Sequence, residues 1–210
     1  MFQGFAPIDF DTFHIEGLEQ RMEAIQSRIQ PKFQAIGEAL VDDLSVLTGQ
    51  EMHVHIAKHA RRTVNPPKDT WMAFCHNKRG YKQHPHFQVG LFDDHLFVWL
   101  AYIYELPEKK RMAKQIRQQQ ALLEEVLGDE DVLSFDHMKK ESVRAKDLTS
   151  KDLKNHLLRF ERVKKAELLI GRHYSPQDET VQDGDKLLAA IKATYTQLLP
   201  IYKLTVGLPV

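Results

Sequence analysis

Residues 84–104, HPHFQVGLFDDHLFVWLAYIY, carry the strongest indication of the fold. From residue 84 to residue 92 apolar and polar side chains alternate, which is typical of a strand with one buried face. After the turn at Asp93-Asp94, residues 95–104 are almost all apolar, and a strand of that kind has to be covered on both faces. Short connections of this sort favour an antiparallel or mixed sheet. The stretch therefore predicts two strands of such a sheet.

Further strands are predicted on both sides of this stretch. In residues 52–59, MHVHIAKH, alternate residues share a face, so the histidines lie opposite an apolar row. Residues 70–76, TWMAFCH, predict another strand, and residues 133–137 and 166–174 predict two more.

Helices account for most of the remaining chain. Between residues 18 and 47 the apolar positions recur with a period close to 3.6 residues, which predicts an amphipathic helix kinked at Pro31. The other predicted helices span residues 107–128, the residues that follow a Thr149–Asp152 capping box, and residues 184–199, where Pro200 ends the last one. The fold class is α+β: an antiparallel or mixed sheet of about four to six strands with helices packed on it.

The composition restricts the class of protein. The chain has 210 residues, of which 42% are hydrophobic, with 29 basic and 29 acidic side chains. Its longest apolar run, residues 96–104, is well short of the about 20 residues that a membrane-spanning helix needs. No signal peptide is visible, and a single cysteine, Cys75, excludes an intrachain disulfide. We expect one α+β domain over residues 1–210, located in the cytoplasm and without a membrane partner.

The neutral total charge hides blocks of opposite sign. Residues 1–52 have a net charge of −6, whereas residues 53–86 have a net charge of +6 and contain six of the eleven histidines. One interpretation is that the two blocks are solvated surfaces that balance each other, within one molecule or between two copies. The other is that the basic block binds an anion.

The middle third of the chain resembles a known family. The runs HVHIAKHARRTVNPPKDTWMAF, residues 53–74, and KRGYKQHPHFQVGLF, residues 78–92, resemble the YktB-like family of low-GC Gram-positive bacteria. Gly17-Leu18 with Arg21-Met22, and Asp136-His137 followed by Lys139, extend the resemblance over nearly the whole chain. What the resemblance implies is a single-domain α+β cytoplasmic protein. It implies no activity, cofactor or catalytic residue, because none is established for that family.

Two H-x-H elements, His53/His55 and His84/His86, are candidates for chemistry. Residues two apart on a strand point the same way, so each element presents two imidazoles on the face away from the apolar row. If the two strands are neighbours, these four histidines are candidate metal ligands, and His59, Asp136 or His137 can complete the set. The paired-histidine phosphoesterases have Ser or Thr two residues after each histidine, and that motif is missing here. No cofactor motif is recognised.

Two basic loops adjoin the histidine face. The first contains Arg61 and Arg62, and the second, residues 78–82, reads KRGYK. Arginine offers a planar fork to phosphate oxygens, and an aromatic ring can stack on a base. The competing interpretation is that these charges pair with the acidic helix of residues 18–47.

The sequence favours the following function. We expect binding of an anionic, phosphate-containing ligand such as a nucleotide or nucleic acid at a His/Arg-rich sheet face, with catalytic residues unknown. The predicted ligand-binding residues are His53, His55, His59, Arg61, Arg62, Lys78, Arg79, Tyr81, Lys82, His84 and His86. One alternative is a phosphoester hydrolase that uses a histidine cluster or a bound metal at the same face. Another is a protein–protein adaptor, including a homo-oligomer joined through complementary acidic and basic surfaces.

Structural roles account for the remaining candidate residues. Trp71, Phe97, Trp99 and the other strand aromatics are expected in the core, and Cys75 as a small buried residue. In Asp136-His137 a direct pair is disfavoured, because adjacent residues on a strand point to opposite faces.

Overall fold

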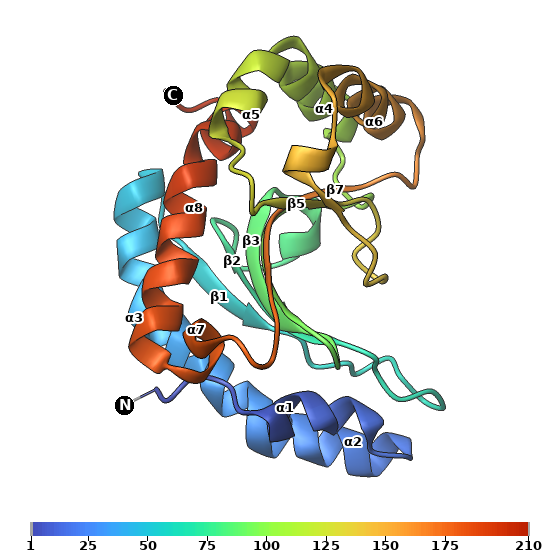
Figure 1. Ribbon diagram of the computed structural model, residues 1–210, viewed down its shortest axis with the longest axis vertical. Coiled ribbons are helices and arrows are strands. Elements are labelled where there is room, and N and C mark those ends of the chain that lie inside the picture. The colour runs from blue at the N-terminus through green and yellow to red at the C-terminus, as the bar shows by residue number, and fades with distance from the viewer. Residues whose placement is uncertain (1, 210) are drawn as a thin grey trace.

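The computed structural model describes residues 2–209 and contains one seven-stranded sheet in which every pairing is antiparallel (Figure 1). The strand order is β1-β2-β3-β4-β7-β5-β6. The strands are β1 (His53–Ile56), β2 (Thr70–Cys75), β3 (His86–Leu91), β4 (Leu96–Tyr102), β5 (Val132–Ser134), β6 (Val143–Arg144) and β7 (Leu168–Tyr174). The predicted α+β class and antiparallel sheet are confirmed. The sheet exceeds the expected size only because β6 adds a two-residue edge strand.

Strand β4 lies in the middle of the sheet and explains the long apolar run in the sequence. All seven of its residues are buried, and it pairs with β3 on one side and β7 on the other. The prediction that this strand is covered on both faces is therefore confirmed.

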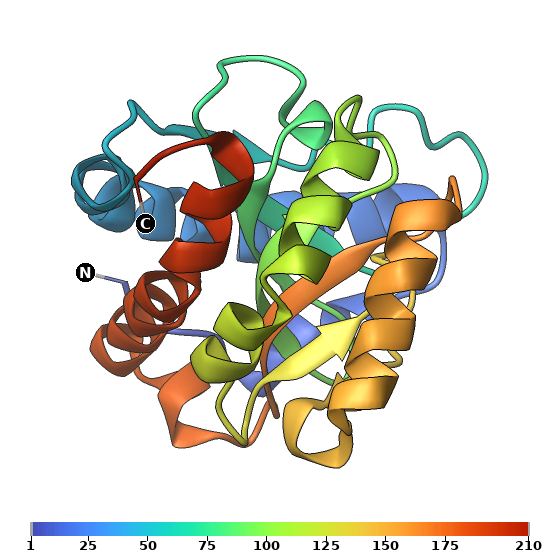
Figure 2. The same cartoon turned by 90° about the horizontal axis from the view of Figure 1, so that it is seen from above.

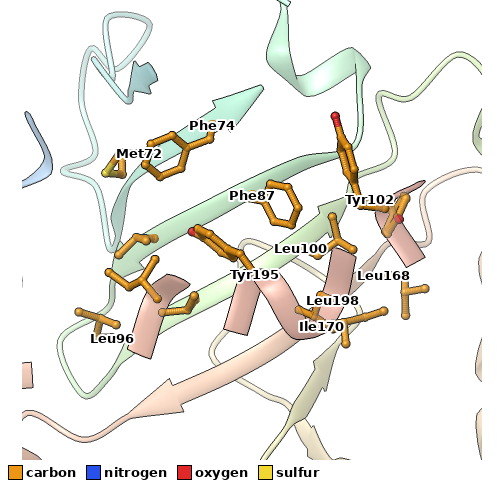
Figure 3. Close-up of a cluster of buried hydrophobic side chains, with 14 of the residues drawn as sticks. Met72, Phe74, Phe87, Leu96, Leu100, Tyr102, Leu168, Ile170, Tyr195 and Leu198 are labelled. Carbon is orange, nitrogen blue, oxygen red and sulfur yellow. The ribbon is translucent and has the colours of Figure 1, made fainter. Parts of the chain in front are cut away.

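Helices cover one face of the sheet. Helix α8 (Gly184–Val206) crosses it beside α3 (Gln30–Thr48), and Figure 2 shows α8, α4 (Lys109–Gln118) and α6 (Ser150–Arg162) side by side above it. In Figure 3, Tyr195 and Leu198 of α8 lie against the side chains of β3, β4 and β7. The Tyr195 ring lies 4.7 Å from the ring of Phe87, and both are fully buried. The shorter helices are α1 (Pro7–Asp11), α2 (Leu18–Ala24), α5 (Gln120–Val126) and α7 (Glu179–Gln182).

Pro31 and Pro200 have different effects on their helices. The predicted helix of residues 18–47 is present as α2 and α3, joined by a π-helical turn at Ile25–Ile29 just before Pro31. The expectation that Pro200 ends the last helix is wrong, because α8 continues to Val206. A proline inside a helix costs about 3 kcal/mol, yet the turn beyond it buries Ile201, Tyr202 and Thr205. Burial of these side chains offsets that cost.

The helix predicted for residues 107–128 is divided. Helix α4 ends at Gln118 and α5 begins at Gln120. Gln119 between them has φ −108° and ψ 36°, which is outside the α-helical region.

A second group of buried side chains lies on the opposite face of the sheet. Phe97 and Trp99 of β4 stack with their ring centroids 3.9 Å apart. Gly90 leaves room for this stack, because a Cβ atom there would collide with the ring of Phe97. Residues outside the strands also contact this face, among them Ala57 and Phe92. We call it the second face. The sequence predicts His53, His55, His84 and His86 on this face, and the strand registers put His53, His55 and His86 there.

No helix within residues 2–209 combines the length and apolar character needed to cross a membrane.

Candidate functional site

Trp71 of β2 lies at the centre of a polar cluster on the second face. Its indole Nε1 donates a hydrogen bond of 2.8 Å to the hydroxyl of Tyr81. The ring of His59 meets the indole edge to face at 5.6 Å, and the amine of Lys82 lies 5.3 Å from the indole centroid. The ring of His137 approaches from another loop, at 6.4 Å. We call the following residues the Trp71 cluster: His59, Asp69, Trp71, Tyr81, Lys82, His86 and His137.

The two H-x-H strands are not neighbours, because β2 lies between β1 and β3. His55 and His86 nevertheless meet the same residue, since the ring of each lies 5.0 Å from the ring of Tyr81. His84 packs against His76 at 4.7 Å instead, and His53 lies opposite Cys75 on the neighbouring strand. The structure thus brings two of the four predicted histidines together through Tyr81.

The basic residues of the region are almost free of ion pairs. Of the seven Lys and Arg side chains in residues 53–86, Lys82 alone forms a salt bridge to a group in residues 2–209, with Glu105 at 3.8 Å. Arg61, Lys78 and Arg79 are exposed. Arg62 is half-buried, and its guanidinium donates to the carbonyl of Asn65. The described structure therefore shows no ion pair between this basic block and the acidic helix region of residues 18–47.

Arg62 and Lys82 act on the same buried groups. Burial raises the pKa of Asp69 to about 6, and the charges of His137, Arg62 and Lys82 oppose that rise. Burial together with Arg62 and Lys82 lowers the pKa of His59 to about 4. Both cations therefore lie close enough to the interior of the cluster to favour negative charge there.

Two further groups of the cluster have fixed protonation states near neutral pH. Burial lowers the pKa of His86 to about 3, so its imidazole is neutral. Burial raises the pKa of Tyr81 to about 12, so its hydroxyl keeps its proton. Because that hydroxyl accepts from the indole of Trp71, its own proton is available to a further acceptor.

His137 is held by a carboxylate that the sequence interpretation missed. Glu167 is 2% exposed and accepts hydrogen bonds from Nδ1 of His137 at 2.8 Å and from its backbone N–H at 2.7 Å. It also accepts from the backbone N–H of Tyr104 at 3.2 Å. The neighbouring Asp136 accepts from the backbone of Met138 instead. The expectation that Asp136 and His137 do not pair directly agrees with this arrangement.

Asp136, His137 and Glu167 are also the one set in residues 2–209 whose potential metal-ligating atoms lie within 4.8 Å of one another. Three protein N–H groups donate to Glu167 and engage most of the roughly four acceptor positions of a carboxylate, which favours a hydrogen-bonded pair over a metal centre. The four histidines predicted as metal ligands do not form such a set in the described chain.

Comparison with known proteins gives the family. A family model described as "Domain of unknown function (DUF1054)" matches residues 5–202. The chain belongs to the DUF1054 family. This DUF1054 chain is 58% identical over 208 residues to a UPF0637 protein of Shouchella clausii, covering 98% of this chain and 97% of that one.

Two other similar proteins carry the same UPF0637 description. One, from Exiguobacterium sibiricum, is 58% identical over 194 residues, covering 92% of this chain and 94% of its own. The other, from Listeria monocytogenes, is 48% identical over 202 residues, covering 96% and 97%. The prediction of a bacterial family is confirmed at this level. The DUF1054 match includes every residue of the Trp71 cluster and Glu167.

Proposed function

We propose that this DUF1054 protein binds a phosphate-containing ligand, such as a nucleotide or nucleic acid, at the Trp71 cluster. The observation that carries the proposal is that Arg62 and Lys82 both act on the interior of the cluster, while Arg62 has no ion-pair partner in the described residues. Guanidinium and ammonium groups in such a position offer charge-assisted hydrogen bonds to phosphate oxygens. The hydroxyl of Tyr81 offers a further proton.

The aromatic groups support a ligand that contains a ring. Trp71 is 9% exposed and lies beneath the amine of Lys82, so a planar group that reaches it lies beside a cation. Stacking of bases on aromatic side chains is tolerant of sequence and suits nucleotides. The neutral total charge disfavours a general nucleic-acid coat and is compatible with one local site. Of the other predicted residues, His55 adjoins the proposed site through its ring contact with Tyr81. His53, Arg61, Lys78, Arg79 and His84 stay predictions from the sequence.

Binding measurements on the full chain test the proposal. Inorganic phosphate, adenosine monophosphate and a short single-stranded oligonucleotide are titrated into the protein by calorimetry at two salt concentrations. The double variant Arg62→Ala/Lys82→Ala is expected to lose at least about tenfold in affinity, because each charge-assisted hydrogen bond contributes about 1.5–3 kcal/mol.

The matched control removes the same charge from helix α6. Lys154 and Arg162 are exposed and have no salt bridge within residues 2–209, so Lys154→Ala/Arg162→Ala is expected to change the affinity less than about twofold. Equal losses in the two double variants would show non-specific attraction and contradict the proposed site.

The adaptor and homo-oligomer alternatives are tested separately. Sedimentation at rising protein concentration reports self-association, and a salt-sensitive dimer without phosphate affinity would favour docking of acidic and basic surfaces. The cytoplasmic location and the narrower YktB-like assignment stay predictions from the sequence.

A further inference from the structure

The contacts of Glu167 fix the tautomer and the direction of His137. The carboxylate oxygens of Glu167 lie 2.8 and 2.9 Å from Nδ1, so Nδ1 carries the proton and donates it. The same carboxylate holds the backbone of both His137 and Tyr104. In the neutral ring the other nitrogen, Nε2, therefore carries the lone pair, and it points away from Glu167. Among residues 2–209 no group forms a hydrogen bond to it. A histidine oriented by a buried carboxylate in this way is prepared to accept a proton.

The second group is a carboxyl that can hold a proton near neutral pH. Asp69 is 1% exposed, and its Oδ2 has no hydrogen-bond partner in the described part of the chain. It stands two residues before Trp71, and the hydroxyl of Thr70 between them lies 3.1 Å from Nε2 of His59, which places Asp69 at the same cluster. Burial raises its pKa to about 6, so a substantial fraction is protonated in mildly acidic to neutral solution. A base and an acid with different environments in one site form the arrangement needed for acid–base catalysis.

We propose that the Trp71 cluster hydrolyses a phosphoester, with His137 as the general base, Asp69 as the general acid and Glu167 as the positioning residue. This activity rests on the proposed function, because the phosphate group of the substrate first has to bind beside Arg62 and Lys82. It goes beyond binding by assigning a reaction class and three roles.

The reaction needs water as its second reactant. Nε2 of His137 takes a proton from water while the water oxygen forms a bond to phosphorus. The bond between phosphorus and the leaving oxygen breaks, and Asp69 gives its proton to that oxygen, which leaves as an alcohol. The proton on His137 then returns to Asp69, directly or through solvent, so both groups are restored. Arg62 and Lys82 stabilise the negative charge on the remaining phosphate oxygens.

The leaving group separates the role of the acid from that of the base. We would assay the full chain with p-nitrophenyl phosphate, phenyl phosphate and bis(p-nitrophenyl) phosphate, with and without EDTA. His137→Gln is expected to lower kcat on every ester that the protein cleaves by about 100-fold or more, with phosphate affinity kept within about twofold.

Asp69→Asn is expected to slow hydrolysis of phenyl phosphate strongly and hydrolysis of p-nitrophenyl phosphate little, because p-nitrophenolate leaves without a proton. The wild-type rate on phenyl phosphate should fall above about pH 6, where Asp69 loses its proton.

Glu167 and a remote histidine complete the experiment. Glu167→Gln is expected to lower kcat by about tenfold with little change in KM, and Glu167→Asp should restore part of it. The melting temperature of each variant identifies a loss that comes from unfolding. His156→Gln, on helix α6, removes an imidazole that stacks on Phe135 outside the cluster and should leave kcat unchanged.

Two failures can be told apart. Phosphate binding without turnover of any of the three esters overturns the catalytic proposal and leaves the proposed function standing, whereas no phosphate binding overturns both. Retention of more than half of kcat in His137→Gln overturns the role of His137. Loss of activity in EDTA overturns the metal-free acid–base mechanism and directs attention to the Asp136, His137 and Glu167 set.

Discussion

One buried amine holds the segment that leads into the candidate site. Lys109 of α4 is 7% exposed, and its Nζ donates to three backbone carbonyls between the end of α6 and the start of β7. The acceptors are Val163 at 2.6 Å, Lys164 at 3.0 Å and Ala166 at 2.6 Å. Ala166 immediately precedes Glu167. A side chain outside the Trp71 cluster thereby fixes the backbone from which the carboxylate partner of His137 projects.

Replacing this amine should destabilise the fold. We expect Lys109→Met to lower the free energy of unfolding by about 3 kcal/mol, because the carbonyls lose charge-assisted hydrogen bonds while remaining shielded from water. Urea unfolding followed by circular dichroism measures the change. Lys110→Met is the matched control, since Lys110 is exposed and its change should stay within about 0.5 kcal/mol. A Lys109→Met protein as stable as the control would show that these hydrogen bonds contribute little.

Two individual residues that complete the site, Glu167 and Asp69, could not be predicted from the sequence. Glu167 is 30 positions from His137, and its only local signal is a single carboxylate before an apolar strand. Asp69 is the one acidic residue among residues 53–86, which sets it apart in the sequence. The sequence does not indicate which residues lie next to it in the fold. The histidines are predicted from their alternation along the strands, and Tyr81 and Lys82 from the composition of the basic loop KRGYK. Contacts between distant loops depend on the strand order, which the pattern of residues does not contain.

Among the elements, helix α6 has a sequence signature that the structure reproduces in full. Thr149 accepts a hydrogen bond from the backbone of Asp152 at 3.2 Å, and the Asp152 carboxylate accepts from the backbone of Thr149 at 3.1 Å. These two bonds satisfy amides that the first turn of a helix leaves unpaired. The helix packs beside α4, and the carbonyls that accept from Lys109 follow directly after its last residue, Arg162.

Loss of the cap should weaken the protein by a small, measurable amount. Thr149→Ala is expected to lower the free energy of unfolding by about 1 kcal/mol. Ser150→Ala, one residue further on, makes the comparable change at an exposed position whose hydroxyl takes part in no hydrogen bond within residues 2–209, and should change stability by less than about 0.5 kcal/mol. Similar values for the two variants in thermal unfolding would remove the cap as the explanation.

Strands and helices were predicted best where the periodicity was long. The central strands β3 and β4 and the capped helix α6 follow from local patterns. The continuation of α8 past Pro200 does not, because it depends on burial of the last turn against residues distant in sequence. Tyr102 of β4, for example, hydrogen-bonds to Thr205 of that turn. Local propensity gives way here to tertiary packing.

On the scale of the whole molecule, the buried histidines make stability depend on pH. Burial lowers the pKa of His59 to about 4, and those of His86 and His173 to about 3. Between about pH 4 and 6.5 the unfolded chain therefore binds a proton at each of these residues that the folded protein does not. Asp69 acts in the opposite direction, since its pKa is raised to about 6 and the folded state holds the extra proton. The three histidines contribute more to the pH dependence of stability than the one carboxyl does. The free energy of unfolding should therefore fall as the pH falls.

We expect the free energy of unfolding to fall by roughly 2 kcal/mol between pH 6.5 and pH 5.5. Urea denaturation at the two pH values measures it. In His86→Gln, which cannot take up that proton when it unfolds, the loss should be smaller by about 1 kcal/mol. A wild-type protein with the same stability at both pH values would contradict the neutral, buried state of these imidazoles.

The order of the strands also governs how the protein meets other chains. The sheet ends in β1, with four residues, and β6, with two. An exposed sheet edge is a template for strand addition and aggregation, and very short edge strands blunt that hazard. A neighbouring chain that extended this sheet at β1 or β6 would find at most four residues to pair with. The long apolar strand β4 lies in the middle of the sheet, where both of its edges are already paired and intermolecular pairing cannot reach it. The molecule can thus concentrate apolar sequence in its centre without offering an amyloid-like surface to its own copies.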